Sequence, residues 1–390
     1  MDTDKHRWKM GKIGVVAMLA FCAFAVAAKQ PDFSKATAIL EQGIKDGAYP
    51  GCTIVVGNED KIIWSQAFGH MEYSDKEPVT KETMYDLASL TKVTGTTSVY
   101  MRLVQLGKIG IHDLVGKYMP EYVDLAPESE KEKRKAVTIE NLLTHTSGFP
   151  SGRPLYKTAN SYQEIILAAC KVPLETDPGT KFTYSDLNLI LAGEIASRVG
   201  GKPLWELERE LVFDPLGMKD TMRNPPASLI PRIAPTEFKV GTETPWRGTV
   251  HDENSRGAGG ITGHAGLFSS GESLAKLATE LLRALDGKGK LMSQAVVADF
   301  VRPHVIGQNS DRGLGWGFTE HQNYETRHAD KRPIYHTGFT GTSIEIDPVR
   351  KIYVILLTNR VYPTRDNSKV QEVRHRLPEA VLRALDKAAK

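Results

Sequence analysis

The 390-residue sequence predicts an α+β fold in which both ends of the chain build one antiparallel sheet, flanked by helices. Two observations predict this fold. Apolar runs typical of strands occur within residues 51–70 and 342–359, and the chain between them carries mainly helical periodicity. We therefore expect a sheet lobe of about residues 31–110 and 291–390, with a helical lobe of about residues 111–290 inserted in it.

The first 28 residues are predicted to be a signal peptide rather than part of the fold. Four basic residues among the first twelve precede an apolar run of about sixteen residues, and Ala25-Val26-Ala27 has the small-x-small pattern of a cleavage site. The run is marginal for a membrane span, so an uncleaved N-terminal anchor is the alternative. We expect export to a periplasm or bacterial cell surface, with residues 29–390 forming the mature domain.

The strands and helices are predicted from local patterns. Apolar runs at 53–56 and 62–64 flank the turn Gly57–Asp60, and a second hairpin turns at Asp347-Pro348 before a continuous apolar strand suited to a sheet interior. Helices are expected from about residue 89 to 107, within 138–148, over 186–200 and over 273–285. The charged run Glu128 to Lys135 is expected to be a solvated loop.

The net charge indicates which kinds of partner to expect, and the cysteine content bears on whether the chain forms a disulfide. Without residues 1–28 the chain keeps 46 of its 50 Lys and Arg and 45 of its 47 Asp and Glu, so it is nearly neutral and no nucleic-acid partner is expected. Cys52 and Cys170 remain in the mature chain. They could pair in an oxidising compartment, but their places in an apolar strand and a helix fit two buried thiols equally well.

Ser89 and Lys92 stand three residues apart where a helical apolar stripe begins. Side chains at i and i+3 share a helix face, and a serine hydroxyl becomes a nucleophile only when a neighbouring base takes its proton. The spacing alone is weak, because it arises by chance about once or twice in a chain this long. Ser273 and Lys276 repeat it in a helix that is otherwise ordinary, with the serine as a cap.

Two further groups lie downstream in the chain. Tyr184-Ser185-Asp186 falls in a loop immediately before a helix, and His336-Thr337-Gly338 is placed at the start of a strand of the C-terminal hairpin. In isolation Tyr184 would be read as a buried loop tyrosine and His336 as a strand-edge histidine. The order of the three groups, on a helix start, a loop and a strand, favours a joint site.

Several acidic and histidine residues admit a metal-binding interpretation. They are His251, Asp252, Glu253, Asn254, His264 and Asp311. No His-x-x-x-His or paired-cysteine spacing accompanies them, so no metal and no other cofactor is expected. The segment 251–254 is expected to support a loop at the rim of a cleft, and His145 to hold the turn after a helix.

These motifs resemble those of the serine β-lactamase and penicillin-binding-protein superfamily, nearest to its class C-like branch. The Ser-x-x-Lys signature marks this superfamily. The segments "LLTHTSGFP", "PGTKFTYSDLNLILAGEI", "VFDPLGMKDT", "VHDEN", "GHAGLFSS" and "HTGFTGTSIEID" extend the likeness over nearly the whole mature chain. The resemblance implies a β-lactamase/transpeptidase-like fold.

The resemblance also implies roles for the motif residues. Ser89 would attack a carbonyl and form an acyl-enzyme, Lys92 would take or hold its proton, and Tyr184 would relay protons to the leaving group and to the deacylating water. The backbone N–H groups of Ser89 and Phe339, beside Gly338, would form the oxyanion hole. Asn359 would contact substrate near the far end of the last strand.

Two residues depart from the class C β-lactamase pattern. Asp186 stands where those enzymes carry asparagine, and an ionised aspartate can hold Lys92 but cannot donate to a substrate carbonyl. His336 stands where they carry lysine, and a histidine near neutral pH is only partly charged. Strong β-lactamase activity is therefore not expected.

The sequence thus predicts an exported serine hydrolase that acts through an acyl-enzyme on ester, amide or peptide substrates, of the esterase or D-Ala/D-amino-acid peptidase type. A class C-like β-lactamase and a non-catalytic cell-wall or β-lactam-binding relative are the alternatives. The expected partner is a small-molecule or peptidoglycan-derived substrate, and membrane attachment is expected only through an uncleaved N-terminal segment.

Overall fold

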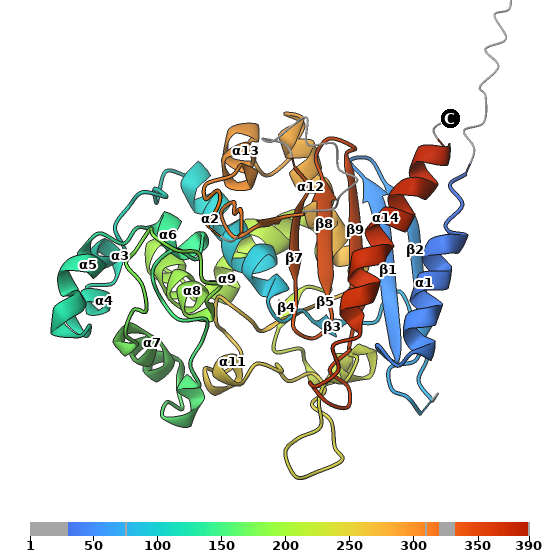
Figure 1. Ribbon diagram of the computed structural model, residues 1–390, viewed down its shortest axis with the longest axis horizontal. Helices are drawn as coiled ribbons and strands as arrows, with labels where there is room; N and C mark the ends of the chain where they lie inside the picture. Colours follow the sequence, from blue (N-terminus) through green and yellow to red (C-terminus); the bar gives the residue numbers. More distant parts are fainter. Residues whose placement is uncertain (1–29, 75, 309, 320–331, 389–390) are drawn as a thin grey trace, which may run out of the picture.

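A computed structural model describes residues 30–388 apart from 75, 309 and 320–331, so the predicted signal peptide lies outside the described residues. Its main sheet has six antiparallel strands in the order β2-β1-β9-β8-β7-β6 (Figure 1). The strands are β1 (Gly51–Asn58), β2 (Ile62–Gly69), β6 (Gly317–Phe318), β7 (Ile334–Thr337), β8 (Ser343–Asp347) and β9 (Ile352–Thr358). Strand β1 pairs with β9, which confirms a sheet built from both ends of the chain.

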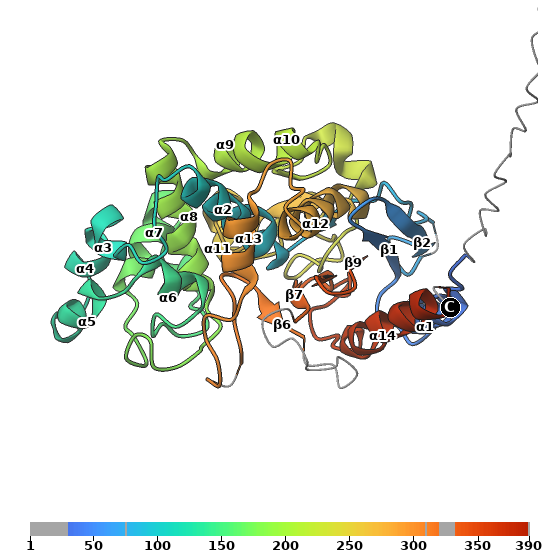
Figure 2. The same ribbon diagram turned by 90° about the horizontal axis from the view of Figure 1, so that it is seen from above.

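Helices cover both faces of this sheet. Figure 2 shows α12 (Gly271–Leu285) on one side and the antiparallel pair α1 (Ser34–Lys45) and α14 (Val370–Ala388) on the other. Every residue of β9 is buried, as expected for a continuous apolar strand covered on both sides. Helix α12 packs on β1 and β9, although the predicted lobe boundary near residue 290 assigned its residues to the helical lobe.

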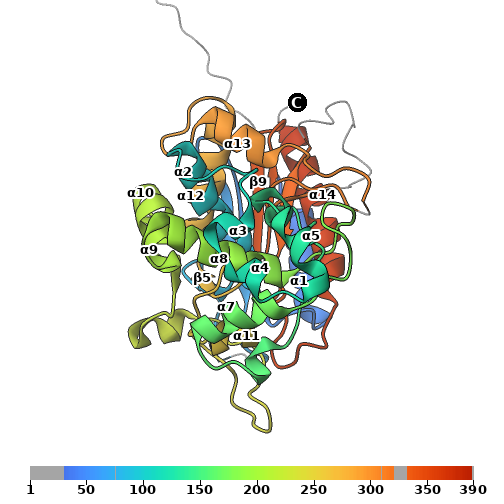
Figure 3. The same ribbon diagram turned by 90° about the vertical axis from the view of Figure 1, so that its left-hand side faces the viewer.

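The helical lobe lies beyond the β6 edge of the sheet and faces the viewer in Figure 3. One apolar core joins the two lobes, because Ile344 and Ile355 of the sheet belong to the same buried cluster as Leu187 and Ile166 of the helices. The remaining helices are α2 (Ser98–Gln105), α3 (Val115–Tyr118), α4 (Glu121–Asp124), α5 (Lys131–Lys135), α6 (Ile139–Leu143), α7 (Tyr162–Lys171), α8 (Asp186–Gly200), α9 (Leu204–Glu208), α10 (Asp214–Leu216), α11 (Glu253–Gly257) and α13 (Gln294–Val301).

A small second sheet was not predicted from the sequence. Its strands β3 (Tyr85–Asp86), β5 (Leu267–Ser269) and β4 (Met222–Arg223) have two or three residues each, too few to show a periodic pattern. Strand β3 ends three residues before Ser89. The second sheet therefore fixes the start of the segment that carries the predicted nucleophile.

The charged run 128–135 differs from its prediction. It forms a 3₁₀ turn and α5, and Arg134 is fully buried. The Arg134 guanidinium donates to the carbonyls of Tyr122, Cys170 and Val172 and pairs with Glu130. The solvated-loop prediction was wrong because one charge of the run is used inside the lobe to satisfy backbone carbonyls.

Cys52 in β1 and Cys170 in α7 are free and buried, so the structure has the two buried thiols rather than the disulfide. Among the described residues, no helix combines the length and the apolar character that crossing a bilayer requires.

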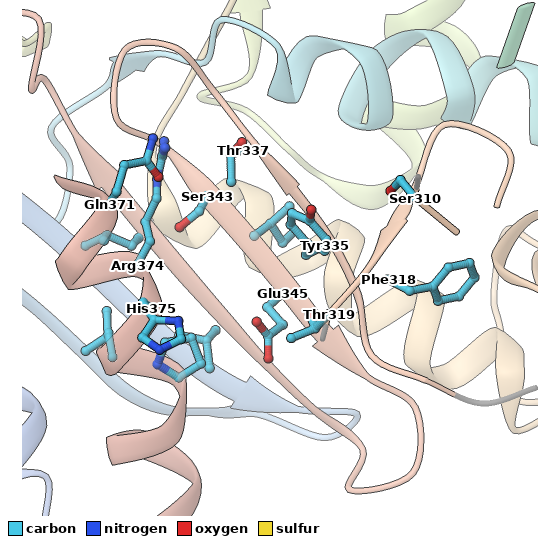
Figure 4. Close-up of a pocket in the computed structure, with 15 residues that line it drawn as sticks. Ser310, Phe318, Thr319, Tyr335, Thr337, Ser343, Glu345, Gln371, Arg374 and His375 are labelled. Atoms are coloured by element: carbon cyan, nitrogen blue, oxygen red, sulfur yellow. The ribbon is translucent and has the colours of Figure 1, made fainter. Parts of the chain in front are cut away.

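A cavity of about 670 Å³ opens between the outer sheet face and α14, where Arg374 and His375 face Tyr335 and Glu345 (Figure 4). Neither Ser89 nor Lys92 lines this cavity.

Candidate active site

Ser89 follows β3 in a tightly held turn. Ala88 has a left-handed backbone (φ 46°), which is unusual for a residue with a side chain, and its N–H donates to Oδ1 of Asp86 over 2.8 Å. Helical turns begin at Leu90 and continue through a π-helix, Lys92–Thr97, into α2. A π-helical turn is frequent at functional sites. The Ser89 side chain is partly exposed at the start of this helix.

The Lys92 side chain contacts that of Ser89, as the spacing predicts. Its Nζ lies 2.9 Å from Ser89 Oγ, 2.7 Å from Asp186 Oδ1 and 3.2 Å from the carbonyl oxygen of His264. The side chain is fully buried. These three acceptors can each take one of the three N–H groups of an ammonium. Lys92 is therefore held in one position against the serine hydroxyl.

The charge of Lys92 follows from its neighbours. Burial lowers its pKa, but the negative charge of Asp186 and the neighbouring Tyr184 raise it by more, so the net shift is upward. Lys92 is thus an ammonium at neutral pH. Lys92 therefore does not have a lowered pKa and instead shares its charge with the neighbouring Asp186.

Tyr184 stands directly before α8, as predicted. Lys92 Nζ lies 5.0 Å from the centroid of the tyrosine ring. The ring of His145 lies 4.6 Å from that of Tyr184 and its Nδ1 accepts the N–H of Ser185 over 3.1 Å. Burial lowers the pKa of His145 well below its usual value, so the ring is neutral. The structural role expected for His145 therefore extends to positioning Tyr184.

The loop after β7 places Phe339 beside Ser89. Thr340 Oγ1 donates to the carbonyl of Asp86 over 2.6 Å, and Thr342 Oγ1 donates to that of Leu87 over 3.0 Å. Within the described part of the chain, the N–H groups of Ser89 and Phe339 have no hydrogen-bond acceptor. These two free donors on segments tied together have the form of an oxyanion hole.

Gly338 makes the approach of the two segments possible. A Cβ atom there would overlap with Thr342 Oγ1 and with the carbonyl oxygen of Leu87. Arg374 of α14 donates to the carbonyls of Gly338 and Thr342, at 2.6 and 2.7 Å, and so fixes the loop from behind. The absence of a side chain at position 338 is therefore a steric requirement.

His336 is placed differently from its prediction. It lies near the end of β7, a strand of its own, rather than at the start of the β8–β9 hairpin. Its ring is buried, Nδ1 donates to the carbonyl of Thr337 over 3.0 Å, and Nε2 has no partner among the described residues. Burial first, and then the charges of Lys92 and Arg312, lower the pKa of His336 to about 3. At neutral pH it carries no charge.

Comparison with known proteins identifies the family of this chain. The Beta-lactamase family model matches residues 36–377. The chain belongs to the beta-lactamase family.

Relatives of Salmonella agona (strain SL483) and Salmonella typhimurium (strain LT2) named "Putative D-alanyl-D-alanine carboxypeptidase" are each 33% identical over 359 residues. The matches cover 83% of this chain and 82% of the relative. A penicillin-binding protein homologue from Caulobacter crescentus (TM-score 0.72, 20% identity) covers 90% of this chain and 97% of its own. A class C β-lactamase from Rhodobacter sphaeroides (TM-score 0.70, 20% identity) covers 90% and 99%. As a member of the beta-lactamase family, the chain is a serine hydrolase.

Arg312 is a further candidate site residue of this beta-lactamase family member, and it was not predicted from the sequence. Its guanidinium stacks on Phe182, 4.4 Å from the ring centroid, and its charge acts on His145 and His336. The side chain makes no hydrogen bond or ion pair within the described residues, and Nε is buried without a partner. Nothing in the spacing of residues 302–332 singles out this arginine, because it lies in a loop.

Asn359 does not reach the site as predicted. It is 1% exposed, and its amide nitrogen donates to the carbonyls of Met71 and Pro235 at 2.7 and 2.9 Å. The residue ties the end of β9 to two loops. The predicted substrate contact was therefore wrong, since the amide is used in the interior.

Of the residues that admitted a metal-binding interpretation, three pair with residues outside that set, and Asp252 and His264 stay together. His251 pairs with Glu237, Glu253 with Arg365, and Asp311 with Arg332. Asp186, Asp252 and His264 have ligand atoms within 4.8 Å of one another. The Lys92 ammonium, 2.7 Å from Asp186, already supplies a positive charge to this group.

In the second Ser-x-x-Lys pair, Ser273 is buried and Lys276 is exposed, and each bonds to a different partner. Ser273 Oγ accepts the N–H of Asp220 over 3.1 Å, and Lys276 donates to the carbonyl of Gly217. The predicted cap, Ser273, was wrong: α12 begins two residues earlier and its cap is Ser270, whose hydroxyl accepts the N–H of Ser273. Equal spacing therefore does not bring serine and lysine together without the buried surroundings that Lys92 has.

Proposed function

We propose that this chain is an exported hydrolase that forms an acyl-enzyme on Ser89 and removes the last residue from peptides ending in a free carboxylate, in the manner of a D,D-carboxypeptidase. The observation that carries the proposal is the 2.9 Å contact between Ser89 Oγ and Lys92 Nζ beside Tyr184. The name of the Salmonella relatives supports the substrate class.

The reaction follows the roles of the site residues. Ser89 Oγ attacks the carbonyl carbon next to the terminal residue, and the developing oxyanion is stabilised by the N–H groups of Ser89 and Phe339, each donor contributing roughly 10²–10³ in rate. The leaving amine takes a proton from the Lys92–Tyr184 side of the site. A water that Tyr184 activates then hydrolyses the ester and releases the shortened peptide.

Arg312 supports the preference for a terminal carboxylate. His336 is neutral and cannot supply a positive charge where class C β-lactamases carry lysine. The Arg312 guanidinium has no acidic partner among the described residues and acts electrostatically on His336 and Tyr184. A guanidinium binds a carboxylate through two parallel hydrogen bonds. We assign to Arg312 the role of recognising the substrate carboxylate.

The experiment compares two substrates in wild type and in Arg312→Gln. A diacyl-L-Lys-D-Ala-D-Ala peptide carries the terminal carboxylate, and p-nitrophenyl acetate carries no charge. We expect Arg312→Gln to raise KM for the peptide roughly 30-fold or more and to leave ester hydrolysis within about threefold. Arg302→Gln, which removes an exposed arginine paired with Asp299, is the matched control and should change neither. Equal losses on both substrates would contradict the assignment.

The class C β-lactamase alternative is weakened by Asp186, which accepts the Lys92 proton and offers no donor to a lactam side chain. We expect nitrocefin to be hydrolysed far more slowly than the ester. Hydrolysis of both at similar rates would favour the alternative.

Export is proposed on the pattern of residues 1–28 and on the D-alanyl-D-alanine carboxypeptidase name of the relatives. Expression of the full chain in a bacterium and intact-mass analysis of the periplasmic fraction should find a protein that begins near residue 29. A full-length product in the membrane fraction would favour the anchor.

A further inference from the structure

Asp252 adds a second carboxylate to the surroundings of Lys92. It caps α11, and its Oδ1 accepts the N–H of Ser255 over 2.7 Å and pairs with His264 Nε2 over 2.9 Å. The carboxylates of Asp252 and Asp186 lie within 4.8 Å of each other. His264 also gives its carbonyl to Lys92, so the same short loop contacts the lysine and holds Asp252.

The ionisable groups that face this region come from five parts of the chain. They are Tyr184 and Asp186 at the start of α8, Asp252 and His264 on either side of α11, His145 after α6, His336 and Arg312 on the β6–β7 side, and Asp86 of β3. Burial raises the pKa of Asp252, but His264, the N–H of Ser255 and, least, the charge of Lys92 lower it by more, so Asp252 is ionised at neutral pH. One ammonium thus faces two carboxylates.

This arrangement raises a problem for the activation of Ser89. An ammonium that donates to Ser89 Oγ, Asp186 Oδ1 and the His264 carbonyl has no lone pair with which to take the serine proton. The proton must therefore pass through Lys92 to another acceptor. Asp186 is in direct contact with Lys92, and an asparagine at this position could not accept a proton.

We infer that Ser89 loses its proton to the Lys92–Asp186 pair, with Asp186 as the final acceptor, and that Asp252 held by His264 is a positioning residue that favours the extra proton on this pair. The inference rests on the proposed acyl-enzyme function and concerns only how the serine is activated. A negative charge within 4.8 Å favours protonation of its neighbours, because each added proton relieves repulsion.

The proton transfers balance as follows. As Ser89 Oγ bonds to the substrate carbonyl carbon and the carbonyl oxygen becomes an oxyanion, the hydroxyl proton moves to Lys92 Nζ and one Lys92 proton moves to Asp186 Oδ1. Lys92 remains an ammonium and Asp186 becomes a neutral acid. When the tetrahedral intermediate collapses, the leaving group takes a proton from Lys92, and Asp186 returns its proton to Lys92.

The pH dependence of acylation tests the inference. In Asp252→Asn we expect the acylation rate on p-nitrophenyl acetate at neutral pH to fall about tenfold and the acidic limb of the rate profile to move to lower pH by about one unit. The limb moves down because the pair gives up its extra proton more readily without the neighbouring charge. A merely structural role would lower the rate without moving the limb.

Two further variants complete the test. Asp186→Asn keeps an acceptor for Lys92 but removes the proton acceptor, so its acylation rate should fall by about 10² or more and its acidic limb should disappear. Glu253→Gln removes the adjacent carboxylate, which pairs with Arg365. This variant should match wild type in the acylation rate and in the pH of the acidic limb of the rate profile. The inference would be overturned if a folded Asp252→Asn protein kept the acidic limb at the wild-type pH, or if Asp186→Asn acylated at the wild-type rate.

Failure of this inference can be told apart from failure of the proposed function. Covalent labelling of Ser89 in wild type tests the acyl-enzyme itself, and only variants that melt cooperatively are compared. If Asp252→Asn does not fold, Asp186→Asn alone decides. If wild type takes the label but the variants behave as wild type, the acyl-enzyme stands and the relay through Asp186 is rejected.

Discussion

His336 shows how one residue changes when its surroundings are known. As a free histidine it would be half-charged near pH 6.5. In the folded chain it is buried, feels the positive charges of Lys92 and Arg312, donates from Nδ1 to the Thr337 carbonyl, and stays neutral. The site therefore contains two permanent cations and a neutral imidazole, rather than a titrating group where related enzymes carry lysine.

The neutral state of His336 predicts how stability depends on pH. Its pKa falls from 6.5 in the unfolded chain to about 3 in the folded one, so between these values only the unfolded chain binds the proton. Stability is unaffected above pH 6.5 and is lost as the pH falls toward 3. His336→Asn keeps a donor for the Thr337 carbonyl without this linkage.

Urea unfolding at pH 7 and pH 5 measures the effect. Wild type should lose about 2 kcal/mol more of its free energy of unfolding between these pH values than His336→Asn does. The same loss in both proteins would show that the imidazole is protonated in the folded state.

At the scale of elements, the loop between β7 and β8 and the segment after β3 form one unit. Two threonine hydroxyls and Arg374 hold them together, and Gly338 leaves room for the contact. The geometry of the predicted oxyanion hole therefore depends on hydrogen bonds between segments that are about 250 residues apart in sequence.

Gly338→Ala tests this dependence. The added methyl group should cost about 1–3 kcal/mol in the free energy of unfolding and lower the acylation rate by roughly 10² or more, because the Phe339 N–H moves away from the oxyanion. Stopped-flow ester acylation and urea unfolding measure both effects.

Gly110→Ala is the control for this variant. It lies on an exposed turn, where a Cβ would meet Asp113 at 3.5 Å in ordinary contact, and it should change stability by less than about 0.5 kcal/mol. A Gly338→Ala protein with wild-type stability and acylation would contradict the steric account.

Elements with local signals were predictable and contacts between segments were not. The hairpins β1–β2 and β8–β9 and helices α8 and α12 follow from apolar periodicity and flanking turns. The π-helix, the burial of Arg134 and the interior role of Asn359 depend on partners elsewhere in the chain. Arg312 and Asp252 have no distinctive spacing, so only the structure brings them to the site.

For the whole molecule, the sheet and the helical lobe share one core, and the three motifs meet where the lobes join. Ser89 comes from the turn after β3 and Lys92 from the start of the π-helix. Tyr184 and Asp186 come from the start of α8, and Phe339 from the loop after β7. The burial of Lys92 requires both lobes, because Lys92 belongs to the sheet lobe and its acceptors Asp186 and His264 lie within residues 111–290. The site therefore exists only in the complete domain.

Covalent labelling with a fluorophosphonate, followed by peptide mass spectrometry, tests the central claim most directly. The folded protein should carry one label, on Ser89, and the label should be absent in Ser89→Ala and formed at least about 10² times more slowly in Lys92→Met. A folded wild-type protein that takes no label, or takes it on another residue, would contradict the account.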